Sequence, residues 1–221
     1  MRHQRALPHG EVPGAVATVC ASAAWTGLKL LFEFLVLTAA RSAEARLATW
    51  EEMDLDARVW TVPSARTKTG REHRVPLSSR AVEILDEARR LRVDSTGVAQ
   101  TELVFPSRRG KAVRDATLSG LLQQLGIGAV PHGFRSSFRD WASERTDHPR
   151  EVIEAALAHV VRNQTEADYA RSDLFGRRRR LMKEWMRYLR VRHPTGSPST
   201  EANRHHAAIP RTPSRGEERS A

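Results

Sequence analysis

Cysteine is almost absent from this sequence, in which Cys20 is the only one among 221 residues. A single cysteine excludes an internal disulfide framework and a cysteine-based zinc site, and it favours a reducing compartment, the cytoplasm. Long apolar runs are also missing. The most hydrophobic stretch, residues 23–40, is short for a membrane span and contains Lys29 and Glu33. We therefore expect a cytoplasmic protein without a membrane segment.

Acidic residues are the minority, since 26 Asp and Glu face 36 Lys and Arg, which gives a formal net charge of +10. An excess of this size indicates a polyanionic partner, most simply nucleic acid. No HExxH motif and no spaced carboxylate cluster occur, so we expect no metal site and no cofactor. The hydrophobic fraction of 40% over this length is enough for one core. We expect one domain over residues 1–190 and a basic, disordered tail over 191–221.

Hydrophobic periodicity predicts a mainly α fold with a small antiparallel β-hairpin or three-stranded sheet. The expected helices cover residues 11–22, 25–37, 42–50, 79–91, 115–125, 131–144, 150–158 and 174–189. The expected strands cover 58–63 and 72–77, with a polar hairpin tip between them, and residues 103–106 resemble a strand end. We expect Asp115 to cap its helix and Gly126 to end it.

Two local motifs contain residues suited to phosphate chemistry. His132 and Arg135, in HGFR, lie three apart, so both can donate to one phosphate from a single helical face. Arg41 and Glu44 follow a buried apolar helix, where a half-buried arginine needs an acidic partner. Each motif by itself is more typical of an ordinary protein surface, the first of a solvated basic helix and the second of a structural ion pair.

Taken together, the motifs resemble the tyrosine recombinases, the phage integrase family, over about residues 5–189. The likeness includes LTAARSAE, RTKTGREHRVPL, HGFR, ALAH and NQTEADYARSD, and it is closest to integrases of P4-type prophages and genomic islands. Six positions match the family's catalytic residues in order: Arg41, Lys68, His132, Arg135, His159 and Tyr169. The resemblance implies a DNA recombinase in which a 3′-phosphotyrosyl link forms and a 5′-hydroxyl is released. It also implies double-stranded DNA as partner, a homotetramer on two sites, accessory DNA-bending proteins, and a prokaryotic, chromosome-associated location.

The chemistry of each matched residue fits such a role. A tyrosine phosphodiester keeps the energy of the cleaved bond, so religation needs no ATP. Only two tyrosines occur, and Tyr188 reads as a packing residue with an exposed hydroxyl, which leaves Tyr169 as the nucleophile. Two arginines supply permanent, forked donors to the phosphate. His132 is a proton acceptor or an orienting group, and His159 a donor.

Lysine is scarce, with four lysines beside 32 arginines. Lys68 lies at the hairpin tip and is suited to protonating the departing 5′-oxygen. Two features depart from the family pattern. Ala40 stands where a glycine is common, and Met1 lies almost at the edge of the catalytic domain, whereas integrases of this type carry arm-binding and core-binding domains before it. We therefore expect loose, salt-sensitive DNA binding and no efficient recombination by this chain alone.

Three other functions remain open at this point. One is a truncated DNA-binding remnant that no longer recombines, which a cleavage assay distinguishes. Another is a type IB topoisomerase, which shares the Arg, Lys, Arg and Tyr chemistry and relaxes supercoils without specific sites. The third is a transcription regulator without chemistry.

Overall fold

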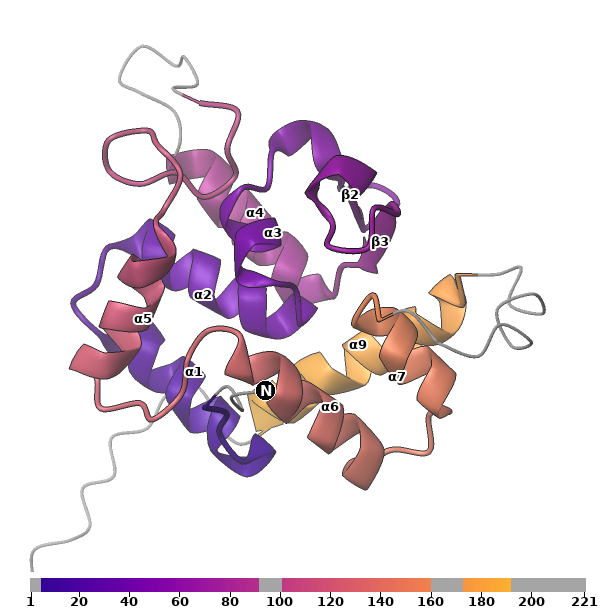
Figure 1. Ribbon diagram of the computed structural model, residues 1–221. Helices are drawn as coiled ribbons and strands as arrows, with labels where there is room; N and C mark the ends of the chain where they lie inside the picture. Colours follow the sequence, from indigo (N-terminus) through magenta and orange to yellow (C-terminus); the bar gives the residue numbers. More distant parts are fainter. Residues whose placement is uncertain (1–4, 92–100, 160–172, 192–221) are drawn as a thin grey trace, which may run out of the picture.

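The computed structural model describes residues 5–91, 101–159 and 173–191 (Figure 1). The elements follow in the order η1 (His9–Glu11), α1 (Val12–Ala21), α2 (Thr26–Thr38), α3 (Ser42–Arg46), η2 (Trp50–Glu52), β1 (Met53–Asp54), β2 (Val59–Val62), η3 (Ser64–Arg66), β3 (His73–Pro76), α4 (Ser79–Leu91), α5 (Asp115–Gln124), α6 (Gly133–Arg145), α7 (Arg150–Ala156) and α9 (Phe175–Val191). The predicted fold class, mainly helical with a small antiparallel sheet, is confirmed.

Helix α2 forms the centre of the core because nearly every position along it is apolar. Nine of its residues are buried, among them Phe32 and Phe34, and the helix packs against α1, α3, α4 and α9. Phe134 of α6 meets Phe32 edge-on, with ring centroids 5.1 Å apart. A helix that is hydrophobic on all sides needs neighbours on all sides. The helices around α2 supply them (Figure 1).

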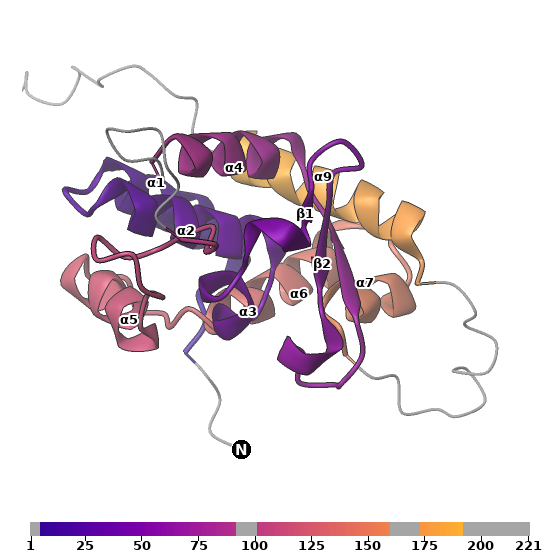
Figure 2. The same cartoon turned by 90° about the horizontal axis from the view of Figure 1, so that it is seen from above.

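The sheet has the order β1-β2-β3, with both pairs antiparallel. In the register of β2 with β3, Trp60 pairs with Val75 and Val62 with His73. Trp60, Val62 and Val75 are buried, which attaches the sheet to the helical core. Figure 2 shows the sheet standing beside the helices, where the connection between β2 and β3 projects from the body. The hairpin therefore presents its polar tip away from the core.

Helix α9 closes the fold against α1, α2, α6, α7 and β3. Trp185 is fully buried and donates its indole N–H to the carbonyl of Val36, 2.9 Å away. Tyr188 stacks on Trp185 with an interplanar angle of 15°. Its hydroxyl lies 2.7 Å from Nδ1 of His9. The prediction of a packing role for this ring is confirmed, and the exposure expected for its hydroxyl stays a prediction.

The ends of several elements differ from the sequence prediction. The helix expected over residues 42–50 ends at Arg46, and a 3-10 turn begins at Trp50. Arg114, not Asp115, is the N-cap of α5; Asp115 instead accepts a hydrogen bond from the Ser42 hydroxyl at 2.5 Å. Residues 103–106 form only isolated bridges, to Thr49 and Ala112. The structure of these short segments depends on contacts with residues distant in sequence. Hydrophobic periodicity carries no information about such contacts.

No helix within the described ranges is long and apolar enough to cross a membrane. The tail predicted over 191–221 lies almost entirely outside the described residues. Tyr169 also lies outside them. The domain boundary near residue 190 stays a prediction.

Candidate active site

The turn that follows α7 lies at the centre of the candidate site. The amide of His159 donates to the carbonyl of Glu154 at 3.0 Å, and the amide of Ala158 to that of Ala155 at 3.1 Å. These two bonds, with Ala158 left-handed at φ +49°, form a Schellman motif. Glycine is usual at this position, and an alanine costs about 1 kcal/mol. The turn leaves the carbonyls of Leu157 and Ala158 available to other groups.

Those two carbonyls each accept from one of the predicted arginines. Arg135 donates from Nη2 to the carbonyl of Leu157 at 2.6 Å and from Nη1 to the carbonyl of Ala39. Arg41 donates from Nη2 to the carbonyl of Ala158 at 3.2 Å. Ala39 is itself left-handed, at φ +48°, at the end of α2. The left-handed C-terminal ends of α2 and α7 therefore hold two guanidinium groups, one from α6 and one from the start of α3.

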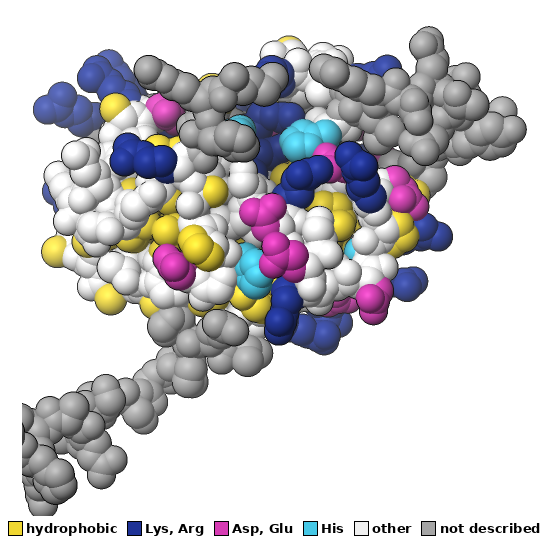
Figure 3. Space-filling view, turned by 60° about the horizontal axis from the view of Figure 1, so that its bottom comes forward, with side chains coloured by type: hydrophobic (Ala, Val, Ile, Leu, Met, Phe, Trp, Pro, Cys, Tyr) yellow, Lys and Arg dark blue, Asp and Glu magenta, His cyan; other side chains and the backbone are white. Residues whose placement is uncertain are grey.

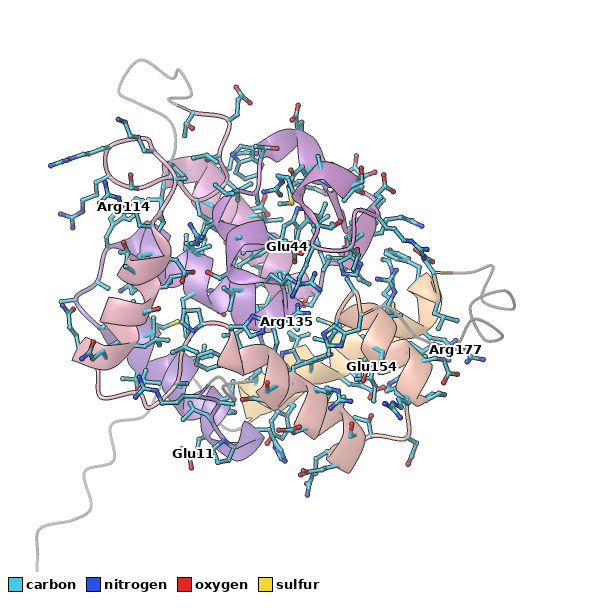
Figure 4. The ribbon with its side chains drawn as sticks, in the orientation of Figure 1. Glu11, Glu44, Arg114, Arg135, Glu154 and Arg177 are labelled. Carbon is cyan, nitrogen blue, oxygen red and sulfur yellow. The ribbon has the colours of Figure 1, made fainter. Side chains whose placement is uncertain are left out.

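Glu44 completes the hold on Arg41. Its Oε1 accepts from Nη1 of Arg41 at 2.8 Å, and its Oε2 from the backbone amide of Arg41 at 2.9 Å, as in a capping box. The carboxylate is 3% exposed, so the predicted partnership of Arg41 and Glu44 is confirmed. Figure 4 shows Glu44, Arg135 and Glu154 in the middle of the ribbon, whereas Glu11, Arg114 and Arg177 lie at its edge.

Arg135 is the most deeply buried cation of the site, at 5% exposure. Burial, together with the nearby charge of Arg41, lowers the pKa of its guanidinium to about 10, with Glu44 opposing the shift. Its hydrogen bonds in the described chain go to neutral carbonyls, not to a carboxylate. A buried cation in such surroundings favours an anionic ligand.

His159 is held by an acidic partner on α7. Its Nδ1 lies 2.5 Å from Oε2 of Glu154, and Oε1 of Glu154 accepts a hydrogen bond from Nε of Arg139 at 2.8 Å within an ion pair. Figure 3 shows histidine side chains next to acidic ones on this face of the molecule. The ring of His159 is thus attached to the same turn that holds both arginines. Sequence reasoning missed Glu154 and Arg139. The one available signal was that Glu154 lies five residues before His159.

His132 lies at the N-cap of α6, not within the helix as expected. Partial burial lowers its pKa, and the positive charges of Arg135, Arg41, His159 and Lys68 lower it further. His132 is therefore neutral at neutral pH, the form that accepts a proton. Lys68 lies close enough for its charge to act on His132. We call Arg41, Lys68, His132, Arg135 and His159 the cationic corner.

Lys68 occupies a tight turn at the tip of the β2–β3 connection. The amide of Gly70 donates to the carbonyl of Thr67 at 3.3 Å, and Gly70 has φ +67°. The Thr67 hydroxyl lies 2.7 Å from the carbonyl of Arg71, which closes the turn. Lys68 is exposed. The predicted location of the lysine at an accessible hairpin tip is confirmed.

Arg66 connects this hairpin to the rest of the site. It donates to Glu52 at 2.6 Å and to the backbone carbonyl of Glu44 at 3.4 Å, while Trp60 also donates to Glu52, at 2.9 Å. The segment with Lys68 and the loop with Arg41 are thereby tied through one guanidinium. Sequence reasoning missed Arg66, because an arginine two residues before the lysine has no distinguishing pattern.

His73, on β3, is a second group that sequence reasoning missed. It is half-buried, and burial together with the charges of Arg178, Arg135 and Arg41 lowers its pKa to about 4, with Glu44 opposing the shift. The imidazole is therefore neutral in the physiological range. Its neighbours show that β3 borders the cationic corner.

The N-terminal segment packs directly beneath α6. The amide of Val130 donates to the carbonyl of Arg5 at 3.1 Å, and the hydroxyl of Ser137 to the carbonyl of Leu7 at 2.5 Å. A Cβ on Gly133 would lie 2.1 Å from the Arg5 carbonyl oxygen. Only glycine permits this close approach. The glycine of HGFR thus has a packing role that the motif alone did not reveal.

Among the described residues, no three His, Cys, Asp or Glu side chains are grouped so that they could hold a metal ion. Five of the six predicted site residues are brought together, and Tyr169 lies outside the described part of the chain. The roles assigned to the six from sequence stay predictions.

Residues 5–174 match the model of the phage integrase family. The chain is 37% identical over 179 residues to prophage integrase IntA of Escherichia coli K12, covering 79% of this chain and 42% of that protein. It is 29% identical over 202 residues to the integrase of Enterobacteria phage P4, covering 83% of this chain and 45% of the relative. The chain therefore spans less than half the length of these two relatives.

Solved structures share the fold at lower identity. The integrase from mycobacterium phage Brujita has a TM-score of 0.60 at 18% identity, covering 90% of this chain and 61% of that one. A lambda integrase dimer bound to a COC′ core site has a TM-score of 0.53 at 21% identity, covering 78% and 60%. The family match spans most of the chain, and the five described site residues gather as the family motifs predict. This chain belongs to the phage integrase family.

Proposed function

We propose that this chain is the catalytic part of a site-specific DNA recombinase that cleaves and rejoins DNA through a phosphotyrosine. The supporting observation is the cationic corner, where two guanidinium groups from distant segments are held at the same turn beside two histidines and a lysine. A scissile phosphate supplies an anion for Arg135, which in the described chain donates only to neutral carbonyls. The relatives named above are integrases, which favours recombination over topoisomerase-like relaxation or a regulator without chemistry.

In the proposed reaction the hydroxyl oxygen of Tyr169 attacks the phosphorus atom and the bond to the 5′-oxygen breaks. The phosphate gains negative charge in the transition state, and Arg41 and Arg135 donate to its non-bridging oxygens. One preorganised donor of this kind contributes about 3 kcal/mol. The backbone carbonyls of Ala39, Leu157 and Ala158 hold both guanidinium groups before the DNA arrives.

Two proton transfers accompany the attack. The phenol of Tyr169 loses its proton as the bond forms, and His132 accepts or orients it, since its lowered pKa keeps it neutral. Lys68 delivers a proton to the departing 5′-oxygen from its exposed turn. Rejoining to a different 5′-hydroxyl reverses these transfers. Neither step requires a metal or a cofactor.

We extend the proposal to the partners. The substrate is double-stranded DNA, and the working unit is a homotetramer assembled on two sites, with accessory DNA-bending proteins assisting. Lambda integrase has been solved as a tetramer bound to a Holliday junction, at a TM-score of 0.54 over 74% of this chain. The net charge of +10 fits a DNA partner.

Covalent trapping tests this function. The probe is a nicked duplex carrying the boundary DNA of the genetic element that encodes the chain, so that cleavage releases a short strand and prevents religation. The wild-type chain is expected to form a denaturant-stable adduct, and Tyr169→Phe to form none while still binding DNA. Tyr188→Phe is the matched control, because it removes a hydroxyl that contacts His9. An adduct in Tyr169→Phe would overturn the assignment of the nucleophile.

A further inference from the structure

Glu154 makes a set of contacts that the proposed chemistry has not yet used. The residue holds His159 twice: its carbonyl accepts from the His159 amide at 3.0 Å, and its Oε2 lies 2.5 Å from Nδ1 of the same residue. The carboxylate is 13% exposed, whereas the ring of His159 is 43% exposed. One edge of the imidazole is therefore fixed against α7, and the ring remains accessible to a ligand.

The second oxygen of the carboxylate is also occupied. Oε1 accepts a hydrogen bond from Nε of Arg139 on α6 at 2.8 Å, and Nη2 of the same guanidinium forms an ion pair with it at 2.8 Å. Burial by itself would raise the pKa of Glu154, but the hydrogen bonds from His159 and Arg139 and their charges lower it. The group is thus a carboxylate at neutral pH. An ionised carboxylate only accepts hydrogen bonds, so the proton between it and the ring belongs to Nδ1.

This proton placement restricts what His159 can do. A neutral imidazole carries one N–H, and the carboxylate claims it at Nδ1, which leaves Nε2 without a hydrogen. Only the doubly protonated ring donates to Glu154 and to a phosphate oxygen at the same time.

We propose that Glu154 is the positioning residue for His159: its carboxylate fixes the ring through Nδ1, so that Nε2 faces the scissile phosphate. This inference rests on the proposed function and assigns a role to a residue outside the six predicted ones. Arg139 supports Glu154 from α6. The same helix end thus positions three groups, two guanidinium groups through its carbonyls and one imidazole through a side chain.

The first test reads the proton on His159 without DNA. The full chain is labelled with ¹⁵N-histidine, and the ring nitrogens of His159 are assigned by their loss in His159→Gln. In the neutral ring, the ¹⁵N shifts distinguish the nitrogen that carries the proton from the one that does not. Glu154→Gln replaces the carboxylate by an amide, which can donate as well as accept, so the wild-type preference for the proton at Nδ1 should weaken. Glu151→Gln, an exposed carboxylate on the same helix, should behave as the wild type. Identical tautomer populations of His159 in Glu154→Gln and wild type would overturn the proposal.

The second test follows covalent trapping of the nicked boundary duplex. Glu154→Gln should trap about tenfold more slowly than wild type, and Glu154→Asp, which keeps a carboxylate, should recover part of that rate. DNA binding in a mobility-shift assay should be unchanged. Equal losses in Glu154→Gln and Glu154→Asp would mean that the carboxylate does not act through His159. If the wild type forms no adduct, the proposed function fails, while the ¹⁵N shifts still decide whether Glu154 controls His159.

Discussion

Two arginines in this molecule occupy opposite electrostatic environments. Arg80, on α4, is surrounded by carboxylates: Glu33 accepts at 2.7 and 2.8 Å, and Glu87 at 2.7 Å. The hydrogen bonds to Glu33 raise the pKa of its guanidinium, despite burial. In the cationic corner, by contrast, burial lowers the pKa of Arg135 to about 10. Arg80 already has its anions, whereas Arg135 is arranged for one that arrives with a substrate.

This difference distinguishes an arginine that stabilises the fold from one that binds a ligand. A guanidinium that already donates to carboxylates stabilises the fold and has little capacity to bind a further anion. A buried guanidinium attached to carbonyls is held in place but not neutralised, so the fold bears an electrostatic cost that binding relieves. Replacing each arginine should therefore affect different measurements.

The largest expected effect is on cleavage by Arg135→Lys. A lysine ammonium does not reproduce the fork that reaches both Ala39 and Leu157, so trapping should slow at least 100-fold, about 3 kcal/mol. Arg80→Lys is the matched change in the paired region and should lower the melting temperature while leaving trapping within twofold. Comparable losses of trapping in the two variants would remove the distinction between the regions.

A second prediction concerns how the stability of the protein depends on pH through His73, which lies on β3 beside the cationic corner. The pKa of His73 is about 4 in the folded protein and about 6.5 in an unfolded chain, so the folded state disfavours its charged form. Its contribution to stability is fully present above pH 6.5 and declines as the pH falls towards 4, by at most about 3 kcal/mol.

The measurement is urea unfolding of the wild type and His73→Gln between pH 4 and 8. The difference in free energy of unfolding between the two proteins should change across this window and be constant above it. A difference that does not vary with pH would show that the cations around His73 do not act on it.

A third effect concerns the packing beneath the cationic corner. Gly133→Ala would bring a Cβ against the Arg5 carbonyl, so α6 and the N-terminal segment must separate. We expect a loss of about 2 kcal/mol in unfolding free energy, measured by denaturant titration. Gly120→Ala in α5 is the control: its Cβ meets nothing within 4 Å, and it should stabilise by about 0.5–1 kcal/mol. Destabilisation by both would point to a general intolerance of alanine.

The smallest effect is expected for metal removal, which should leave the rate of trapping unchanged. If the cationic corner supplies the charge that stabilises the transition state, trapping in excess EDTA should equal trapping in magnesium within experimental error. Loss of the adduct in EDTA, restored by magnesium or manganese, would mean that a metal provides part of that charge.

The long helices were predictable because each has its own hydrophobic periodicity. The helix of residues 79–91 agrees at both ends with α4, and the buried face of α6 agrees in Phe134, Phe138 and Trp141. The short elements were less predictable from the sequence. Strand β1 is two residues long and exists only because Met53 pairs with Trp60. A segment of this length has no period to detect.

The sequence by itself determined which residue types are available: one cysteine, two tyrosines, an excess of arginine, and six positions in the family's order. It also determined the pairing of Arg41 with Glu44, since an N-cap residue and the third residue of its helix face each other in a capping box. Only the tertiary structure decided that two left-handed alanines, Ala39 and Ala158, aim their carbonyls at the arginines, and that Glu154 holds His159. Such contacts join segments up to 117 residues apart, and they depend on how helix ends meet in space, which no local pattern encodes.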